Sequence, residues 1–249
     1  MLFRSQAPAF RSQNNVVRAS TIDGSNVRLW FSPNTKAKSK PSKNATAPMD
    51  MTEVFAAIAG AQRAVLFLLF QPGSPSVFDA VLAAQKSKPH LFVRGAATDA
   101  KAVGKYNTDL VHRPGDPRVT VVAAAAITDQ FAFWQKELLK VSPAAHAIIH
   151  DKIVVIDPRS PNCVVITGSH NLGYRASYNN DENMLIIRGN QALAAAYAVH
   201  VMDVYDHYRF RYTVQTKKAG AWTGLVPDDT WQDKYFDDAS IKSEVEFWA

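Results

Sequence analysis

The chain has 249 residues, of which 47% are hydrophobic and 20% charged, and its formal net charge is +6 at pH 7. These proportions are typical of a globular protein with a sizeable core, folded as one large domain or two small ones. Clean apolar runs such as 64–70 are too short to cross a bilayer, and the first residues hold no stretch suited to a secretory signal, so we expect a soluble, cytoplasmic protein. The single cysteine, Cys163, excludes an internal disulfide and a cysteine-rich zinc site.

The positive charge is concentrated near the N-terminus. Residues 1–45 contain eight Lys or Arg against one Asp, whereas residues 213–249 contain four Lys against seven Asp or Glu. A basic segment of this kind could bind nucleic acid or another anionic surface such as a membrane. A solvated polar segment is the simpler interpretation of the same composition.

In chain order, residues 1–26 are polar, show no sustained period and are interpreted as a basic lead-in. A short strand is expected at 26–31, followed by a loop rich in Pro, Lys, Ser and Asn. Asp50 and Glu53 resemble a capping box, which predicts a helix over 51–63. Further strands are expected at 64–70, 91–96, 119–125, 146–157, 163–168 and 183–189, and further helices near 75–86, 129–140 and 190–211.

Strands that alternate with helices predict an α/β domain in layers, with the catalytic domain spanning residues 27–212. The remaining segment, 213–249, is acidic and dense in aromatic residues. Aromatic side chains at that density usually pack on something, so we expect a C-terminal extension that docks on the domain.

Chemistry-bearing residues concentrate between positions 150 and 182. The run H-D-K-I-V-V-I-D supplies His150, Lys152 and Asp157, and G-S-H-N supplies Gly168, Ser169 and Asn171. Asp181 and Glu182 form an acidic pair soon afterwards. Side chains at i and i+2 of a strand face the same way, so His150 and Lys152 should project together, as should Ser169 and Asn171.

This set suits attack on a phosphodiester. An ammonium neutralises phosphate oxygens, and an imidazole can attack phosphorus and divide one displacement into two easier ones through a phosphohistidine. A hydroxyl and an amide can hydrogen-bond the same phosphate. A histidine nucleophile also needs its other ring nitrogen oriented, which calls for a nearby carboxylate.

The pattern His-x-Lys-x4-Asp followed by Gly-Ser-x-Asn resembles the signature of the phospholipase D superfamily, and the similarity runs from Val27 to about Arg211. The resemblance implies a layered sandwich with a central mixed sheet flanked by helices. It implies His150 as nucleophile or leaving-group acid, and Lys152 and Asn171 as phosphate ligands supported by Ser169 at the Gly168 turn. It further implies that Glu182 orients the histidine, that Asp157 is mainly structural, and that no metal or other cofactor takes part.

The chain departs from the family pattern by carrying the motif once. Sites of this family use two facing motifs, one histidine as nucleophile and the other as general acid, and neither His90 nor His112 fits a second copy. The second half should therefore come from a homodimer or from a missing segment of a longer enzyme.

Other histidines and one arginine have alternative roles. His146 and His150 are four apart, as in helical zinc motifs, but the β-branched neighbours favour a strand. His170 should point away from the phosphate and pack, while His200 and His207 are interpreted as helix-face residues. Arg94 could reach phosphate, although an ion pair is the simpler role.

For function, a phospholipid phosphodiesterase is favoured over a metal-independent endonuclease, because the middle of the chain carries little excess positive charge. A non-catalytic half is the lesser alternative.

Overall fold

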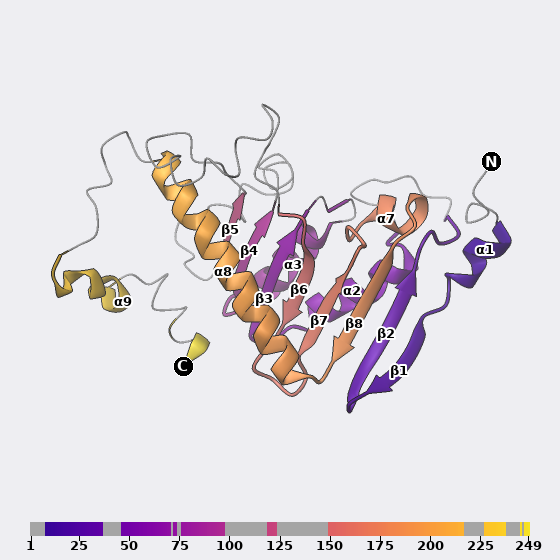
Figure 1. Ribbon diagram of the computed structural model, residues 1–249, viewed down its shortest axis with the longest axis horizontal. Helices are drawn as coiled ribbons and strands as arrows, with labels where there is room; N and C mark the ends of the chain where they lie inside the picture. The colour runs from indigo at the N-terminus through magenta and orange to yellow at the C-terminus, as the bar shows by residue number, and fades with distance from the viewer. Residues whose placement is uncertain are drawn as a thin grey trace.

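The computed structural model describes residues 8–36, 46–70, 72–73, 76–97, 119–123, 149–216, 227–237, 245 and 247–249. Within these residues eight strands form one mixed sheet in the order β1-β2-β8-β7-β6-β3-β4-β5 (Figure 1). The strands are β1 (Arg18–Ile22), β2 (Ser25–Phe31), β3 (Ala64–Leu69), β4 (Phe92–Ala97), β5 (Val119–Ala123), β6 (Lys152–Ile156), β7 (Val164–Gly168) and β8 (Asn183–Arg188). The helices are α1 (Pro8–Gln13), α2 (Met49–Gly60), α3 (Val77–Ser87), α7 (Tyr174–Asn179), α8 (Gln191–Thr216), the 3-10 helix η3 (Asp229–Gln232) and α9 (Lys234–Asp237). The predicted α/β layered fold is confirmed.

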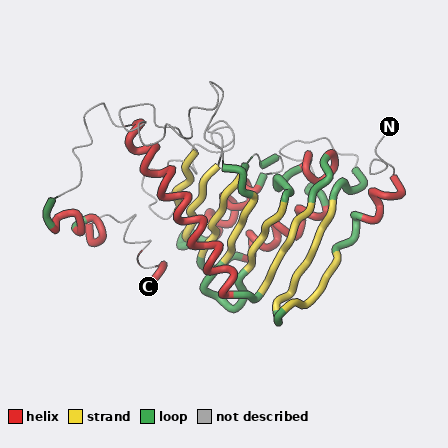
Figure 2. Tube along the Cα trace, in the orientation of Figure 1, coloured by secondary structure: helices red, strands yellow, loops and turns green. Residues whose placement is uncertain are grey.

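The sheet separates two hydrophobic layers. Helices α2 and α3 cover one face, and the long helix α8 crosses the other, as Figure 2 shows. Alternate residues of β3 serve the two layers: Val65, Phe67 and Leu69 pack toward α2 and α3, whereas Ala64, Leu66 and Leu68 pack toward α8. A strand buried on both faces reads as a continuous apolar run, which explains the sequence at 64–70.

The strand directions gather several strand ends at one edge of the sheet. Strand β6 is antiparallel to both β3 and β7, and β8 is antiparallel to both β7 and β2. The amino ends of β6 and β8 therefore lie beside the carboxyl ends of β3, β7 and β2. Segments that are far apart in the sequence meet at this edge, which we call the catalytic edge because the candidate catalytic residues His150, Lys152 and Glu182 lie there.

The lead-in over residues 1–26 is more structured than the sequence indicated. Helix α1 and strand β1 lie within it, and β1 pairs with β2 along its whole length. The predicted boundary at residue 27 therefore falls inside the β1–β2 hairpin. All five residues of β1 are exposed, so the strand needs no alternation of polar and apolar residues, and that alternation is the signal by which strands are predicted.

Other differences concern the limits of elements. The strand expected over 146–157 begins only at Lys152 in the described residues, and the short helix α7 was not expected. The helix expected near 129–140 lies outside the described residues, as does His112. None of the helices in the described part of the chain combines the length and the apolar character that crossing a bilayer requires.

The C-terminal segment contacts the domain through its last residues. The Phe247 ring stacks on Phe92 with 4.6 Å between ring centroids, and Arg159 donates to the backbone oxygens of Phe247 and Trp248. Three aromatic residues of η3 and α9, Trp231, Tyr235 and Phe236, are exposed. The described aromatic residues of this segment thus divide into a packed end and an exposed stretch before it.

Candidate active site

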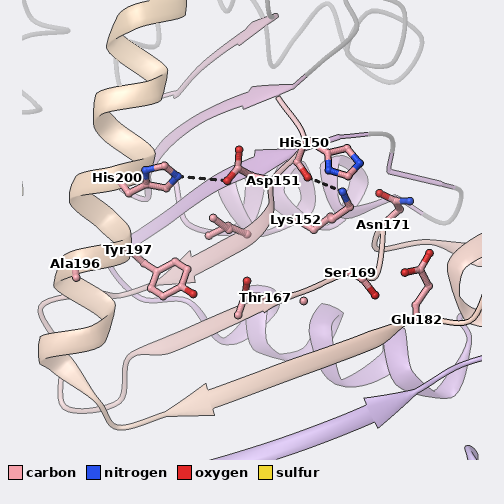
Figure 3. A pocket seen from close by; sticks show the side chains of 12 residues that line it. His150, Asp151, Lys152, Thr167, Ser169, Asn171, Glu182, Ala196, Tyr197 and His200 are labelled. Carbon is pink, nitrogen blue, oxygen red and sulfur yellow. Dashed lines mark hydrogen bonds and ion pairs between the residues drawn. The ribbon is translucent and has the colours of Figure 1, made fainter. Parts of the chain in front are cut away.

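A pocket of about 810 Å³ opens at the catalytic edge (Figure 3). Its wall combines the start of β6, the end of β7 and the loop after it, Glu182 just before β8, and one turn of α8. Six of the residues singled out in the sequence as substrate or catalytic groups line it: His150, Lys152, Gly168, Ser169, Asn171 and Glu182. The topology explains the gathering, because these residues sit at strand ends that the antiparallel pairings place side by side.

Lys152 is the cation of the pocket. Its side chain is largely buried, and its ammonium donates to the His150 carbonyl oxygen at 2.5 Å and lies 4.9 Å from the centroid of the Phe70 ring. Burial lowers the pKa of Lys152 from its ordinary value, while the carboxylates of Glu182 and Asp151 act in the opposite direction. A phosphate bound in the pocket would add a negative charge close to this partly desolvated ammonium.

His150 precedes β6 and is exposed to the pocket. Its ring meets Phe70 edge to face, with 4.7 Å between the centroids and an interplanar angle of 66°. Phe70 follows β3 directly, so one aromatic ring contacts both His150 and Lys152. The two side chains line one pocket, as their spacing of two residues predicted, and the imidazole is open to a substrate.

The loop after β7 is held in an unusual conformation. Gly168 has a φ of 138°, and a Cβ there would lie 2.4 Å from the Asn183 backbone oxygen, so no other residue fits without a shift. The same oxygen accepts the backbone N–H groups of Ser169 and His170, and Ser169 Oγ accepts the N–H of Asn183. The Gly168 turn thereby holds Ser169 and Asn171 on the pocket wall, while His170 turns inward, as predicted.

Asn171 presents its side-chain amide to the pocket. Its Oδ1 is buried and has no hydrogen-bond partner among the residues that the structure describes. Buried polar atoms are nearly always hydrogen-bonded in folded proteins, so this acceptor is an exception. The NH₂ group of the same amide is the donor that could reach a phosphate oxygen in the pocket.

Glu182 lies across the pocket from His150, with Asn171 between them and Ser169 beside Glu182 in Figure 3. Its Oε1 accepts from the Asn180 amide at 3.2 Å, and its charge acts on Lys152. No hydrogen bond joins Glu182 to the His150 ring among the contacts described. The orienting role that the resemblance implies for Glu182 stays a prediction, and its electrostatic effect on Lys152 is what the geometry displays.

Asp157 lies at the opposite end of β6, away from the pocket. Its carboxylate accepts the backbone N–H groups of Gln62, Arg63 and Ala64 at 2.7–2.8 Å. Asp157 is five positions after Lys152 along the strand direction, a span of roughly 16 Å. Asp157 therefore contacts nothing in the pocket, and its bonds fix the turn from α2 into β3.

The sequence did not identify the part of the pocket that α8 lines. Ala196, Tyr197 and His200 face it, and His200 Nε2 lies 3.3 Å from Asp151 Oδ1. Asp151 points toward α8 because it alternates with His150 and Lys152 along the chain. No local signal marks His200, since only the packing of α8 on the sheet brings it to the pocket.

Other candidate residues have structural partners. Three arginines of the basic segment bond within the fold: Arg11 to the backbone oxygens of Asn34 and Tyr178, Arg18 to those of Gln13 and Val16, and Arg28 to the Glu53 carboxylate. Arg4, Lys38, Lys40 and Lys43 lie outside the described residues.

Arg94 is fully buried and packs over the rings of Phe92 and Tyr205. The ion pair expected for it stays a prediction. His146, the partner in the zinc alternative, is not described. Within the described ranges, no three His, Cys, Asp or Glu side chains form a metal-binding group.

Comparisons with known proteins place this geometry in a family. A family model described as the phospholipase D-like domain of cardiolipin synthase matches residues 54–202. No curated protein matches the chain. Among solved structures, the chain is similar to Nuc of Salmonella typhimurium, a phospholipase D family member, at 18% identity and a TM-score of 0.48, covering 74% of this chain and 95% of that one.

Two further structures are similar. NucT of Helicobacter pylori is 14% identical with a TM-score of 0.49, covering 74% of this chain and 97% of that one. A phosphatidylserine synthase of Haemophilus influenzae is 12% identical with a TM-score of 0.39, covering 74% and 40% respectively. The family model matches more than half of the chain, and its range includes every motif residue from His150 to Glu182. The chain belongs to the phospholipase D-like family.

Proposed function

We propose that the protein is a metal-independent phosphodiesterase that acts through a phosphohistidine on His150. One observation carries the proposal: an exposed imidazole, a partly desolvated ammonium and the side-chain amide of Asn171 line a single open pocket. These are the nucleophile and the phosphate ligands that the reaction needs, and their positions follow from the strand ends that carry them.

In the first step, a ring nitrogen of His150 gives its lone pair to phosphorus, and the bond from phosphorus to the leaving alcohol oxygen breaks. Lys152 and the donors of Ser169 and Asn171 hold the non-bridging oxygens. A second imidazole protonates the leaving oxygen. It then removes a proton from water or an acceptor alcohol, whose oxygen displaces His150 from phosphorus.

The second imidazole comes from a second motif. A second copy of this chain would bring its own His150 to the open side of the pocket, across a two-fold axis. A missing segment of a longer enzyme would supply the same group. Supporting the need for it, no other imidazole among the described residues lies beside Lys152, and His200 is engaged with Asp151 at the far end of the pocket.

A phospholipid is the favoured substrate. The matching family model is that of a phospholipid-synthesising enzyme. Lys152 is the single Lys or Arg among the described residues that line the pocket, whereas a nucleic-acid groove usually carries several. An endonuclease would use the same residues on the same diester bond, so the substrate is decided by assay.

The test replaces His150 by Ala. Turnover of bis-p-nitrophenyl phosphate, of phosphatidylglycerol vesicles and of plasmid DNA is measured for wild type and variant in the presence of EDTA. The proposal expects one diester to be hydrolysed by wild type with EDTA present, a loss of about 10⁴-fold or more in the variant, and a phosphorus-labelled histidine trapped by acid-free quenching.

His90→Ala is the matched control. His90 is an exposed histidine whose Nε2 lies 3.0 Å from the Gln62 backbone oxygen, remote from the pocket. Undiminished turnover by a folded His150→Ala protein would overturn the assignment, as would activity that EDTA abolishes and zinc restores. Cleavage of plasmid alone would replace the phospholipid by nucleic acid, and a folded wild type that cleaves none of the three would indicate the non-catalytic half.

Assembly is tested by sedimentation together with activity. A homodimer predicts that activity per chain falls on dilution at the concentration where the sedimentation coefficient falls. A monomer that is active at every concentration would contradict a shared site.

A further inference from the structure

A buried polar cluster lies behind the loop that carries Ser169 and Asn171, and none of the steps above uses it. Asp50 begins α2, His170 lies in the loop after β7, and Ser177 belongs to α7; their exposed fractions are 0%, 2% and 0%. Ser177 Oγ donates to Asp50 Oδ1 at 2.8 Å. Asp50 Oδ2 and Ser177 Oγ each lie 3.2 Å from His170 Nε2.

The hydrogen bonds select one form of the His170 ring. Nδ1 accepts the backbone N–H of Leu172 at 3.0 Å, so this nitrogen carries no proton. The proton of a neutral ring is then on Nε2, where Ser177 Oγ accepts it at 3.2 Å, while Asp50 Oδ2 lies at the same distance without a hydrogen bond to the ring. The cluster therefore holds His170 as the neutral Nε2–H tautomer.

This arrangement is not a second nucleophilic site. In a Ser-His-Asp triad the carboxylate and the hydroxyl bind opposite nitrogens of the imidazole. Here both approach Nε2, Nδ1 is occupied by the Leu172 amide, and Ser177 is inaccessible to any substrate. The chemistry of the cluster is directed at the backbone instead.

The backbone that it holds is strained. Leu172 has a φ of 51°, in the left-handed region that residues other than glycine rarely adopt, and Gly168 at the other end of the loop has a φ of 138°. Such conformations persist when surrounding contacts enforce them. The bond from the Leu172 N–H to His170 Nδ1 closes the turn that contains Asn171.

We propose that Asp50, His170 and Ser177 are positioning residues, which fix the His170 tautomer and thereby hold Ser169 and Asn171 in place on the phosphate. The proposal rests on the proposed function for its kinetic consequence. Its structural core is independent of that function, because the tautomer and the turn can be measured without a substrate.

The first experiment is nitrogen-15 NMR of histidine side chains in the full chain, with Asp50→Asn as the principal variant. The introduced amide can keep its oxygen toward Ser177 and Met51 and then presents its NH₂ to His170 Nε2. Two donors would face each other, so the ring should shift to the Nδ1–H tautomer and release the Leu172 amide. The expected signature is an Nε2–H pattern in wild type, an Nδ1–H pattern in the variant and faster hydrogen exchange at Leu172.

The second experiment measures kcat and KM. If the Asn171 amide is misplaced, its contacts with the phosphate should weaken more in the transition state than in the ground state. We therefore expect Asp50→Asn to lower kcat by about 10- to 100-fold, with KM changed by less than about threefold. His170→Phe keeps a ring of similar size without hydrogen bonds and should behave alike. His170→Asn should keep most of the kcat that His170→Phe loses, because the asparagine side-chain oxygen can accept the Leu172 N–H.

Ser25→Ala is the matched control for Ser177→Ala. Ser25 is also a buried serine, and its Oγ accepts from Asn190 at the opposite edge of the sheet. Ser25→Ala removes one side-chain hydrogen bond and Ser177→Ala removes two, those to Asp50 and His170, and only Ser177→Ala should lower kcat.

Three results would overturn the proposal. One is a wild-type His170 that is protonated on Nδ1, and another is an Asp50→Asn variant whose tautomer changes while kcat stays constant. The third is an equal loss of kcat in Ser177→Ala and Ser25→Ala. If no diester is turned over at all, the proposed function fails, and the tautomer and the Leu172 exchange still decide the positioning network.

Discussion

The two ends of β6 show how one sequence motif serves two purposes. At the amino end, His150 is exposed and Lys152 is partly desolvated, and both face an open pocket. At the carboxyl end, Asp157 is buried and each of three backbone N–H groups donates to its carboxylate. Within eight residues, side chains that line an open pocket are followed by a carboxylate whose hydrogen bonds are made within the fold. We expect substitutions at the first end to affect chemistry and those at the second to affect stability.

After the loss expected for His150→Ala, the largest effect on activity should follow Lys152→Met. The substitution keeps most of the side-chain volume over the Phe70 ring and removes the charge that holds phosphate. Loss of a preorganised electrostatic partner typically costs about 10²- to 10³-fold in kcat, and we expect a loss at the upper end because the pocket offers no second lysine among the described residues that line it. Steady-state kinetics with the diester cleaved by wild type measures it.

Stability should not fall with that activity. The pKa of Lys152 is lowered, so the charged form is disfavoured in the folded chain relative to the unfolded one. The fold is penalised at pH values below the lowered pKa, and the penalty disappears as pH rises from there toward 10.5. Thermal unfolding at pH 7 should therefore find Lys152→Met at least as stable as wild type. A variant that unfolds many degrees lower would contradict the division between the two ends of β6.

The same shift gives activity an alkaline limit. The ammonium must be charged to hold phosphate, so kcat/KM should fall as pH rises through the lowered pKa, with a midpoint below the ordinary value of 10.5. The alkaline limb should be missing from the residual activity of Lys152→Met.

The opposite end of β6 predicts the reverse outcome. Asp157→Ala leaves three backbone N–H groups at the start of β3 without their acceptor, and we expect a loss of roughly 3 kcal/mol in the free energy of unfolding. Denaturant unfolding measures this loss, and kcat per folded molecule should stay within about twofold of wild type because the pocket lies roughly 16 Å away. A fall in kcat without a fall in stability would place Asp157 among the functional residues.

Local pattern in the sequence was sufficient for the catalytic edge. Strand periodicity predicted that His150 and Lys152 share the pocket and that Ser169 and Asn171 do so while His170 turns inward. It did not predict that Asp151, the residue between the first two, also lines the pocket. The order of elements likewise predicted an α/β sheet with helices on both faces. These features depend on neighbours within a few residues, which is the range over which sequence patterns are informative.

Long-range contacts could not be predicted in the same way. Asp50 was interpreted as half of a capping box, yet its side chain meets His170 and Ser177, more than a hundred residues away. Strand β1 was not predicted, because both of its faces are exposed and its sequence therefore lacks the alternation typical of a strand. The position of α8 beside the pocket depends on how the helix crosses the sheet, and that crossing cannot be predicted from the helix sequence alone.

The smallest effect on activity is expected from substitution of His200, which lies on the part of the pocket lined by α8. His200 and Asp151 form a half-exposed pair 3.3 Å apart, with side-chain exposures of 49% and 34%, so their separation should cost almost no stability. The pair and Tyr197 lie at the end of the pocket away from Asn171, where a substituent of the diester would extend. His200→Ala should therefore raise KM by about two- to fivefold and leave kcat nearly unchanged, since uniform binding affects KM alone. Asp206→Asn, which removes another exposed pair of α8 with Arg209 outside the pocket, is the control and should change neither constant. If His200→Ala instead lowered kcat as strongly as His150→Ala, the second imidazole of the reaction would lie within this chain, and a second copy would not be needed to complete the site.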